Sequence, residues 1–334
     1  MQEQVIATEL KDSIAKQEIY GVSFSLISQQ QNQYTYWGFT GKGEQHQPVS
    51  PDLYYDLASL TKVIATTTRC LQLLVNGRIN LTDTLGMFLP KAAAKELTIE
   101  QLLLHRTGLV ADLPNVHELT SVELQEQVLA SLPQVTPGTK TEYSDLNFIL
   151  LGWIIAQVDG DLLESITEHV FKPLNMAHTF YQPELHIATS LCVPTEYQEE
   201  RGLVQGEAHD YKAHLLNGVS GHAGLFGTLT DLTKFTRVLS GLTPNEQVMP
   251  QAAFDLLAKY DVGARTLGWQ RWSHDEQYWH TGFTGTSIAF DRQKHTGFVC
   301  LTNRIYPTRT NKGFVHTRRQ LLQAFFGRKR EWNQ

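Results

Sequence analysis

Alternating apolar and polar residues mark strands near both ends of the chain. Residues 21–28, "GVSFSLIS", place Val22, Phe24 and Leu26 on one side and serines on the other, which is typical of a half-buried strand. Residues 33–41 alternate again after a polar turn, so the two segments predict a hairpin. Four further strands, separated by turn residues, are predicted near the other end, at residues 267–272, 277–283, 285–291 and 296–304.

Helical spacing dominates the middle of the chain. Residues 59–77 place Leu60, Ile64 and later apolar residues on one face, and Asn76-Gly77 provides a helix-ending signal. The N-terminal segment reads as a charged amphipathic helix. The other predicted helices cover residues 98–105, 121–132, 146–158, 162–171 and 229–241, and a last one begins at about Asn311.

Strands from both ends with helices between them predict an α/β (α+β) fold of one domain, residues 1–334. The sheet is expected to be mainly antiparallel and covered by helices, because its strands come as hairpins. We expect an α/β lobe from about 1–75 and 215–334. We expect residues from about 76 to 214 to form an inserted, mostly helical lobe. Ligand-binding sites usually form in a cleft between two such lobes.

Composition narrows the possible functions. The chain has 334 residues, 41% of them hydrophobic and 19% charged, as in ordinary globular proteins. A net charge of −6 without a basic block argues against a nucleic-acid partner. The three scattered cysteines form no disulfide or metal motif. No membrane span or signal peptide is recognised, so we expect a cytoplasmic protein; its oligomeric state is left open.

The segment "YYDLASLTKVIATTT" contains the first candidate chemistry. Ser59 and Lys62 are separated by three positions, so on a helix they share a face. A serine hydroxyl needs an adjacent base to act as a nucleophile. The apolar neighbours Leu57, Leu60 and Val63 would favour a neutral, basic lysine. By itself, however, the S-x-x-K pattern is more often incidental than catalytic.

A second candidate lies in "PGTKTEYSDLNFILLG". Tyr143 falls in the loop just before a strongly apolar helix, where its phenol can project into a cleft and relay a proton. The alternative interpretation is a tyrosine packed at a helix start, with Asp145 as the N-cap.

A third candidate is the segment His280-Thr281-Gly282 at the end of a predicted strand. Glycine in a strand permits close approach of a ligand to the backbone. The backbone N–H of Phe283 would then pair with that of Ser59 as an oxyanion hole. Taken alone, a histidine at a strand end is more often an ordinary surface residue.

The order and spacing of the three segments change this balance. The sequence resembles the serine β-lactamase, penicillin-binding protein and esterase superfamily, and within it the class C β-lactamase, D,D-peptidase and D-aminopeptidase branch. The resemblance extends over nearly the whole chain. Its supporting stretches are "DLASLTK", "LTIEQLLLHRTGL", "PGTKTEYSDLNFILLG", "VFKPLNM", "SGHAGLFGTLTDLTKF" and "HTGFTGTS".

The resemblance implies a β-lactamase/transpeptidase-like fold and a role for each matching residue. Ser59 corresponds to the nucleophile, Lys62 to its base and Tyr143 to the acid/base. Residues 280–282 correspond to the family's Lys-Thr-Gly strand. The implied chemistry is acyl transfer to Ser59 followed by hydrolysis, without a cofactor.

Two positions depart from the family pattern. Asp145 replaces the usual asparagine, so a carboxylate that pairs with Lys62 and raises its pKa takes the place of an amide. His280 replaces the strand lysine, so a fixed cation becomes a group that is mostly neutral at pH 7. We assign Asp145, His280, Thr281 and Gly282 to substrate binding, and we expect true β-lactamase activity to be weak or absent.

Histidines in residues 209–222 raise the question of a metal site. His209 and His214 are five residues apart, which does not place both on one helical face, and no closed ligand set is visible, so we predict no metal. We expect His209 and Asp210 to have structural roles. His222 is assigned to the substrate side, either orienting a catalytic group or bonding backbone.

For the other polar and aromatic residues we consider, a structural role is the favoured interpretation. His105 and Arg106 are expected to cap a helix. Arg304 and Arg309 are expected at the surface, with carboxylate binding as the alternative. Most of the aromatic residues near the last strands are expected in the core, with one or two lining an acyl pocket: Trp269, Trp272, Tyr278 and Trp279.

The sequence therefore predicts a serine hydrolase with an acyl-enzyme on Ser59. Its substrate is expected to be a small molecule or short peptide: an acyl ester, a D-amino-acid amide or a cell-wall-derived peptide. Two alternatives from other classes remain open. One is a non-catalytic module that binds peptidoglycan fragments, and the other is a metallohydrolase that uses the histidines of residues 209–222.

Overall fold

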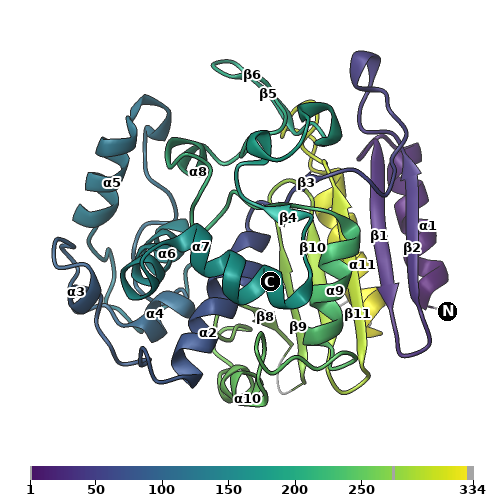
Figure 1. Ribbon diagram of the computed structural model, residues 1–334. Helices are drawn as coiled ribbons and strands as arrows, with labels where there is room; N and C mark the ends of the chain where they lie inside the picture. Colours follow the sequence, from purple (N-terminus) through teal and green to yellow (C-terminus); the bar gives the residue numbers. More distant parts are fainter. Residues whose placement is uncertain (1, 273–274, 329–334) are drawn as a thin grey trace.

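The computed structural model describes residues 2–272 and 275–328. Its centre is an antiparallel sheet in the order β2-β1-β11-β10-β9-β8 (Figure 1). In it the N-terminal hairpin pairs directly with the last strand, and Phe24 lies opposite Cys300. The prediction of an antiparallel sheet from both chain ends is thus confirmed. The strands of this sheet are β1 (Gly21–Ile27), β2 (Asn32–Gly38), β8 (Gln270–Arg271), β9 (Gln277–Thr281), β10 (Ser287–Asp291) and β11 (Thr296–Thr302).

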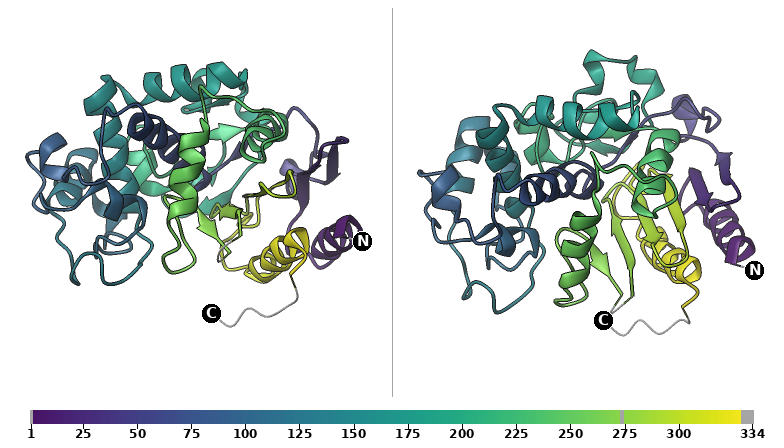
Figure 2. Two further views of the ribbon diagram at one scale, coloured as in Figure 1. Left: turned by 90° about the horizontal axis from the view of Figure 1, so that it is seen from below. Right: turned by 60° about the horizontal axis from the view of Figure 1, so that its bottom comes forward.

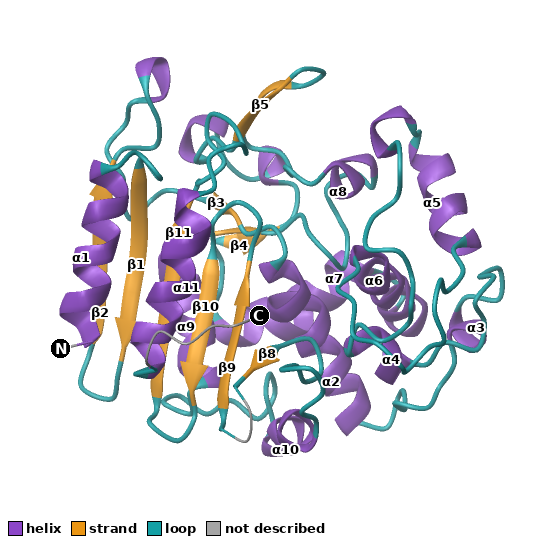
Figure 3. Cartoon of the chain, turned by 180° about the vertical axis from the view of Figure 1, so that it is seen from behind, coloured by secondary structure: helices purple, strands orange, loops and turns teal. Residues whose placement is uncertain are grey.

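Helices from distant parts of the chain cover both faces of this sheet. The first and last helices, α1 (Gln2–Ala15) and α11 (Gly313–Phe326), lie side by side on one face (Figure 3). Helix α9 (Leu229–Leu239) packs on the other face, against β1 and β11. Apolar side chains that strand alternation directs to the α1 and α11 side, such as Phe24 and Phe298, form a core with those helices.

The polar face of β1 is buried as well, so the prediction of a half-buried strand is wrong. Ser23 and Ser25 are at most 1% exposed. The Ser23 hydroxyl bonds to the Tyr55 hydroxyl at 2.9 Å, and Ser25 bonds to Thr233 of α9 at 2.8 Å. Hydroxyl pairing satisfies these polar groups inside the protein, which is why α9 can cover them.

The middle of the chain carries most of the remaining helices, as expected, and the short strands form a three-stranded sheet, β3-β7-β4, and a two-stranded sheet, β5-β6 (Figure 1). Its α-helices, with α10 from the later part of the chain, are α2 (Thr68–Val75), α3 (Leu85–Phe88), α4 (Ile99–Leu103), α5 (Ser121–Ala130), α6 (Asp145–Asp159), α7 (Leu162–Ile166), α8 (Tyr211–Leu215) and α10 (Gln251–Lys259). The short strands are β3 (Tyr55–Asp56), β4 (Thr179–Phe180), β5 (Glu196–Gln198), β6 (Gly202–Val204) and β7 (Phe226–Gly227). The π-helical turns are η2 (Lys62–Thr67) and η4 (Thr167–Phe171), and the 3₁₀ turns are η1 (Gly43–Gln45), η3 (Val116–Glu118), η5 (Lys172–Leu174), η6 (Pro183–Leu185) and η7 (Thr189–Leu191).

One hydrophobic core connects the helical and sheet-containing parts. It includes Leu60 just before η2, Ile149 of α6 and Val299 of β11, all less than 1% exposed. Two further views show the helices of the middle of the chain packed along one side of the sheet (Figure 2). The division into lobes near residues 76 and 214 stays a prediction, since this core crosses both boundaries.

Helix α6 is apolar on all sides, because other helices surround it in the core. Among the described residues, no single helix has both the length and the apolar composition to cross a membrane. The bent pair Asp145–Asp159 and Leu162–Leu174 meets those criteria only when both members are counted together.

Candidate active site

Ser59 lies in the tight turn that joins β3 to η2. The preceding residue, Ala58, has a positive φ of 47°, a strained conformation for a residue with a side chain. Asp56 holds this turn: its Oδ1 accepts from the Ala58 N–H at 2.7 Å, and its Oδ2 accepts from the His209 N–H at 2.7 Å. Ser59 is therefore fixed at the start of the helix, with a π-helical first segment of the kind often found at functional sites.

Lys62 is completely buried beneath Ser59. Its Nζ donates to Ser59 Oγ at 3.0 Å and to the His222 carbonyl at 2.9 Å, and lies 2.7 Å from Asp145 Oδ1. Burial favours a lower pKa for Lys62, but the negative charge of Asp145 outweighs burial and raises the pKa above its ordinary value. Two of these contacts are hydrogen bonds, and the third is a close ion pair with the Asp145 carboxylate.

Asp145 belongs to a longer chain of charges behind the serine. Lys212 Nζ lies 3.2 Å from Asp145, 3.4 Å from Asp210 and 2.8 Å from Asp112. Burial raises the pKa of the Asp145 carboxyl, but Lys62 and Lys212 outweigh it and lower that pKa to about 2. We conclude that Asp145 is a carboxylate held between two ammonium groups.

His222 completes this network from the protein interior. Its side chain is fully buried, with Nε2 2.7 Å from Asp210 Oδ1 and Nδ1 2.8 Å from the Ser220 hydroxyl. Its backbone carbonyl, not its imidazole, contacts Lys62. We therefore place His222 behind the site, where it positions Lys62 and Asp210.

Asp145, Asp210 and His222 have ligand atoms within 4.8 Å of one another, a grouping that could hold a metal ion. Two lysines already neutralise these carboxylates, however. Lys212 contacts both Asp145 and Asp210, and Lys62 contacts Asp145. A divalent cation here would have to displace an ammonium group or share its carboxylate oxygens.

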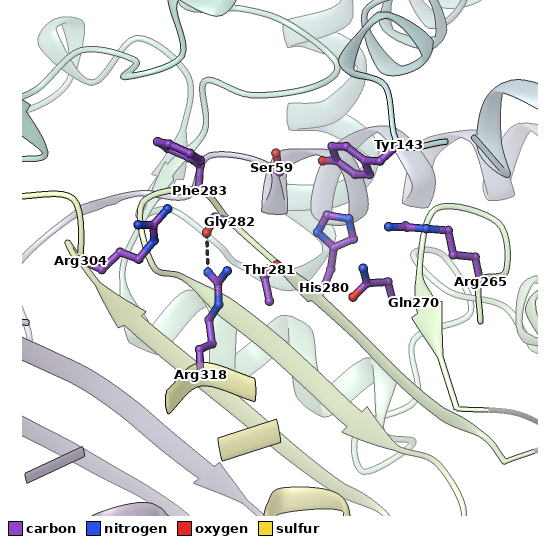
Figure 4. A pocket seen from close by; sticks show the side chains of 10 residues that line it. All are labelled: Ser59, Tyr143, Arg265, Gln270, His280, Thr281, Gly282, Phe283, Arg304 and Arg318. Atoms are coloured by element: carbon purple, nitrogen blue, oxygen red, sulfur yellow. Dashed lines mark hydrogen bonds between the residues drawn. The ribbon is translucent and has the colours of Figure 1, made fainter. Parts of the chain in front are cut away.

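Tyr143 lies in the loop just before α6 and extends over Lys62. Lys62 Nζ is 5.1 Å from the centre of its ring. Figure 4 shows the Tyr143 and Ser59 hydroxyls pointing toward one another. The helix N-cap is Ser144 and Asp145 is the first helical residue, so the prediction of Asp145 as N-cap is wrong by one position.

His105, expected to be a helix cap, supports Tyr143 instead. It follows α4 with a positive φ of 53°, and its buried ring lies 4.5 Å from the Tyr143 ring. Its Nδ1 accepts from the Ser144 N–H at 3.2 Å. Burial and the nearby Arg265 charge lower the pKa of His105 well below its usual range, so the ring is neutral.

The end of β9 forms the opposite wall of the site. A Cβ on Gly282 would lie 2.6 Å from the Leu57 carbonyl oxygen, so only glycine fits this close approach to the segment before Ser59. Phe283 follows, 43% exposed. Within residues 2–272 and 275–328, neither the Ser59 N–H nor the Phe283 N–H donates to a protein acceptor.

Two cavities meet at Ser59. The first, of about 270 Å³, is shown in Figure 4 and is lined by Ser59, Tyr143, Arg265, Gln270, His280, Thr281, Gly282, Phe283, Arg304 and Arg318. The second, of about 240 Å³, is lined mainly by polar residues, most of them from the middle of the chain: Asp112, Asp145, Gln198, His209, Asp210 and Lys212, together with Arg309 from the segment after β11. The nucleophile candidate thus faces space on both sides, as a bond-cleaving site requires.

His280 borders the first cavity but is only 2% exposed. Burial first, and then the positive charges of Arg265 and Lys62, lower its pKa well below the usual range. The ring is therefore neutral, and neither nitrogen has a partner with hydrogen-bond geometry among the described residues.

The structure brings most of the predicted site residues together, but not all candidates. His209 and Arg309 both pair with Glu196, at 2.8 and 2.6 Å, beside the second cavity. His214 contacts Glu207 and lines neither cavity at Ser59. The predicted aromatic residues lie in the core, as expected for most of them, while none lines these two cavities: Trp269, Trp272, Tyr278 and Trp279.

Sequence reasoning missed three residues that the structure places at the site. Lys212 is buried in the charge network, and Arg265 and Arg318 line the first cavity. Lys212 comes two positions after Asp210 in "HDYKAH". This proximity to Asp210 was the only local sign that Lys212 belongs to the site. The two arginines come from a loop and from α11, which nothing in the local pattern links to Ser59.

Comparisons with known proteins show the family to which the chain belongs. The family model described as Beta-lactamase matches residues 6–321. An N-acetylmuramyl-L-alanine amidase of Bacillus subtilis is 29% identical over 298 residues, 75% of this chain and 68% of that protein. A putative D-alanyl-D-alanine carboxypeptidase of Escherichia coli is 28% identical over 339 residues, 84% of this chain and 78% of that protein.

A solved structure shares the fold over the full length. The Beta-Lactamase/D-Alanine Carboxypeptidase from Pseudomonas syringae superimposes with a TM-score of 0.78 at 20% sequence identity, over 99% of each chain. The family model spans far more than half of the chain. The chain therefore belongs to the Beta-lactamase family and is a serine hydrolase of the peptidase or esterase type.

Proposed function

We propose that this hydrolase cleaves an amide bond of a short, cell-wall-derived peptide through an acyl-enzyme on Ser59. The observation that carries the proposal is the contact of Ser59 Oγ with the buried Lys62 ammonium at 3.0 Å, at the point where two cavities meet. Relatives named as an amidase and a carboxypeptidase support an amide substrate.

The first step forms a bond between Ser59 Oγ and the substrate carbonyl carbon. The carbonyl oxygen becomes negative and accepts from the Ser59 and Phe283 N–H groups, neither of which has a protein acceptor. The C–N bond then breaks and the leaving amine takes a proton. Water attacks the ester in the second step, releasing the acid and restoring the Ser59 hydroxyl.

Tyr143 is the group we assign to the proton transfers. Lys62 donates to Ser59 and the His222 carbonyl, and the Asp145 carboxylate 2.7 Å away raises the Lys62 pKa, so we assign it the ammonium form, which has no lone pair. The Tyr143 hydroxyl points at Ser59 (Figure 4). As its oxygen accepts the Ser59 proton, it gives its own O–H proton to the leaving nitrogen, so the phenol is regenerated and the proton count balances. Lys62 then acts as a fixed cation that orients Ser59 and stabilises the negative charge of the reaction.

A substrate panel tests this proposal. It compares a muramyl peptide, a D-alanyl amide, p-nitrophenyl acetate and nitrocefin, with the Ser59→Ala variant as control. We expect turnover of at least one amide, little nitrocefin hydrolysis and no turnover by the variant. Binding of cell-wall fragments without turnover of any substrate would favour the non-catalytic alternative. Chelator-sensitive turnover that survives Ser59→Ala would favour a metallohydrolase.

A further inference from the structure

The ring of Phe283 is covered by side chains from two other segments of the chain. Its centre lies 5.5 Å from the centre of the His209 ring, and the two ring planes are 21° apart. The guanidinium carbons of Arg304 and Arg309 lie 4.9 and 5.4 Å from the same centre, and Figure 4 shows Arg304 beside the Phe283 ring. Guanidinium groups at this distance are attracted to an aromatic face. The ring is therefore held although Phe283 is partly exposed.

Glu196, the first residue of β5, connects two of these neighbours and is itself buried. Arg309 donates to Oε1 from its backbone N–H at 2.8 Å and from Nε at 2.9 Å, and to Oε2 from Nη2 at 2.6 Å. His209 Nε2 lies 2.8 Å from Oε2. Burial raises the pKa of Glu196, but the hydrogen bonds from His209 and Arg309 outweigh burial and hold that pKa well below its usual range. Glu196 is thus a carboxylate, so it accepts from both partners.

His209 also reaches the other half of the proposed oxyanion hole. Its backbone N–H donates to Asp56 Oδ2 at 2.7 Å, and Asp56 Oδ1 accepts from the Ala58 N–H at 2.7 Å. Asp56 thereby fixes the turn that carries the Ser59 N–H. His209 therefore contacts the Ser59 turn through its backbone and the Phe283 ring through its side chain.

The backbone at Phe283 depends on such contacts, because glycines lie close on both sides of it. Gly282 precedes Phe283, and Gly285 follows with a φ of 116°. Glycine leaves a chain more conformational freedom than any other residue. An oxyanion donor is effective only when its direction is set before the reaction. The contacts of the Phe283 ring restrict this freedom and so help to direct the Phe283 N–H.

We propose that Glu196 is a positioning residue of the oxyanion hole: by holding His209 and Arg309 against the Phe283 ring, it fixes the Phe283 N–H relative to the Ser59 N–H. Glu196 itself lines neither cavity at Ser59, so it acts through the two side chains that it binds. This inference rests on the oxyanion hole of the proposed function but not on the amide substrate. Loss of Glu196 weakens binding of the transition state rather than of the substrate.

The test is a double-mutant cycle of Glu196→Gln and Phe283→Leu, measured as kcat/KM for p-nitrophenyl acetate. Glu196→Gln keeps the size of the side chain but removes its charge, so kcat/KM should fall at least roughly tenfold, part of the loss expected for a whole oxyanion donor. Phe283→Leu keeps the backbone N–H but removes the ring, and should lose a similar factor. In the Phe283→Leu protein, Glu196→Gln should cost less than roughly twofold more, because no ring remains to be held.

The matched control is Glu207→Gln. Glu207 also pairs with an arginine and a histidine, Arg201 at 2.7 Å and His214 at 3.0 Å, but lines neither cavity at Ser59. Its kcat/KM should stay within roughly twofold of wild type. Denaturant unfolding shows whether each variant is folded. If Glu196→Gln is not, Arg309→Gln takes its place in the cycle, because Arg309 is half exposed and its loss leaves the His209 contact with Glu196.

The ester keeps this test separate from the proposed amide substrate, because p-nitrophenyl acetate contains no peptide. Non-additive losses on the ester support the role of Glu196 even where no peptide is hydrolysed. If the ester is not turned over either, the same cycle is measured on the affinity for phenylboronic acid, whose boron bonds to Ser59 Oγ and places an oxygen where the oxyanion forms. With either probe, an unchanged Glu196→Gln protein, or equal losses with and without the Phe283 ring, would overturn the inference.

Discussion

The charge of Lys62 is set by three oxygen atoms: Ser59 Oγ, the His222 carbonyl and Asp145 Oδ1. Of these only Asp145 carries a full charge, and it is shared with Lys212. Lys62 pKa is raised because this carboxylate outweighs the desolvation of the buried amine. We therefore expect Lys62 to stay charged during acylation.

Asp145→Asn removes that carboxylate. The pKa of Lys62 should fall, so the ammonium form is lost at a lower pH and the alkaline limb of kcat/KM moves to lower pH. At neutral pH, kcat/KM should fall by about tenfold, or about 1.4 kcal/mol. The measurement is a pH–rate profile of both proteins.

The matched control for this prediction is Asp112→Asn, which removes a carboxylate that contacts Lys212 but not Lys62 and is 59% exposed. Its alkaline limb should stay in place. An alkaline limb that does not move in Asp145→Asn, or that moves upward, would show that the Lys62 ammonium is not the group required.

The sequence predicted the residues of the site where helix geometry or closeness in the chain links them to one another. Ser59 and Lys62 are one turn apart, and the pairing of Asp145 with Lys62 was anticipated from the departure from the family pattern. Arg265 was not predictable, because it reaches the site from an irregular loop. Its partners are fixed only when that loop packs beside Tyr143 and β9.

At the scale of elements, the site is the contact between the β3–η2 turn and the end of β9. Thr284 and Thr286 tie these segments together: their hydroxyls donate to the Asp56 carbonyl at 2.8 Å and to the Leu57 carbonyl at 3.1 Å. These bonds place the Phe283 N–H beside the Ser59 turn. This contact between elements would therefore control the geometry of the proposed oxyanion hole.

Gly282→Ala should disrupt this contact. The new Cβ would meet Thr286 Oγ1 at 2.1 Å and the Leu57 carbonyl oxygen at 2.6 Å. We expect the free energy of unfolding to fall by about 1–3 kcal/mol and kcat/KM by about a hundredfold, the scale of losing one oxyanion donor. Denaturant unfolding and steady-state kinetics measure the two effects.

Gly77→Ala serves as the control for that variant. Gly77 has a φ of +67° and no heavy atom within 4 Å of an added Cβ, so its stability loss comes from backbone strain at the end of α2. It should cost about 1 kcal/mol while kcat/KM is retained. An active Gly282→Ala enzyme would contradict the assigned oxyanion geometry.

Strand and helix positions were largely predictable, because periodicity is a local property. Helix α2 ends at Asn76-Gly77, where the sequence predicts its end. The final helix begins two residues after Asn311, the predicted start. The burial of β1 was not predictable. A serine face reads as solvent-exposed unless the hydroxyl partners, here Tyr55 and Thr233, are known.

At the scale of the whole molecule, buried neutral histidines link stability to pH. The pKa values of His105 and His280 lie well below the ordinary 6.5 in the folded protein, chiefly because both rings are buried. Below about pH 6.5 the unfolded chain therefore binds protons that the folded protein does not. Unfolding becomes more favourable as the pH falls.

We accordingly expect the free energy of unfolding to decrease between pH 7 and pH 5, with a slope of up to about 1.4 kcal/mol per pH unit for each such histidine. His280→Asn should flatten this dependence, whereas His316→Asn, which alters an exposed histidine, should not. Denaturant unfolding at each pH measures the slope. A His280→Asn protein with the wild-type slope would contradict a neutral, buried His280.

The central claim is that Ser59 forms a covalent acyl-type adduct. Intact-protein mass spectrometry after fluorophosphonate treatment, followed by peptide mapping, tests it most directly. We expect one adduct per chain, located on Ser59, and no adduct in Ser59→Ala or in heat-denatured wild type. A folded wild-type protein that is not labelled, or a Ser59→Ala protein labelled to the same extent, would contradict it.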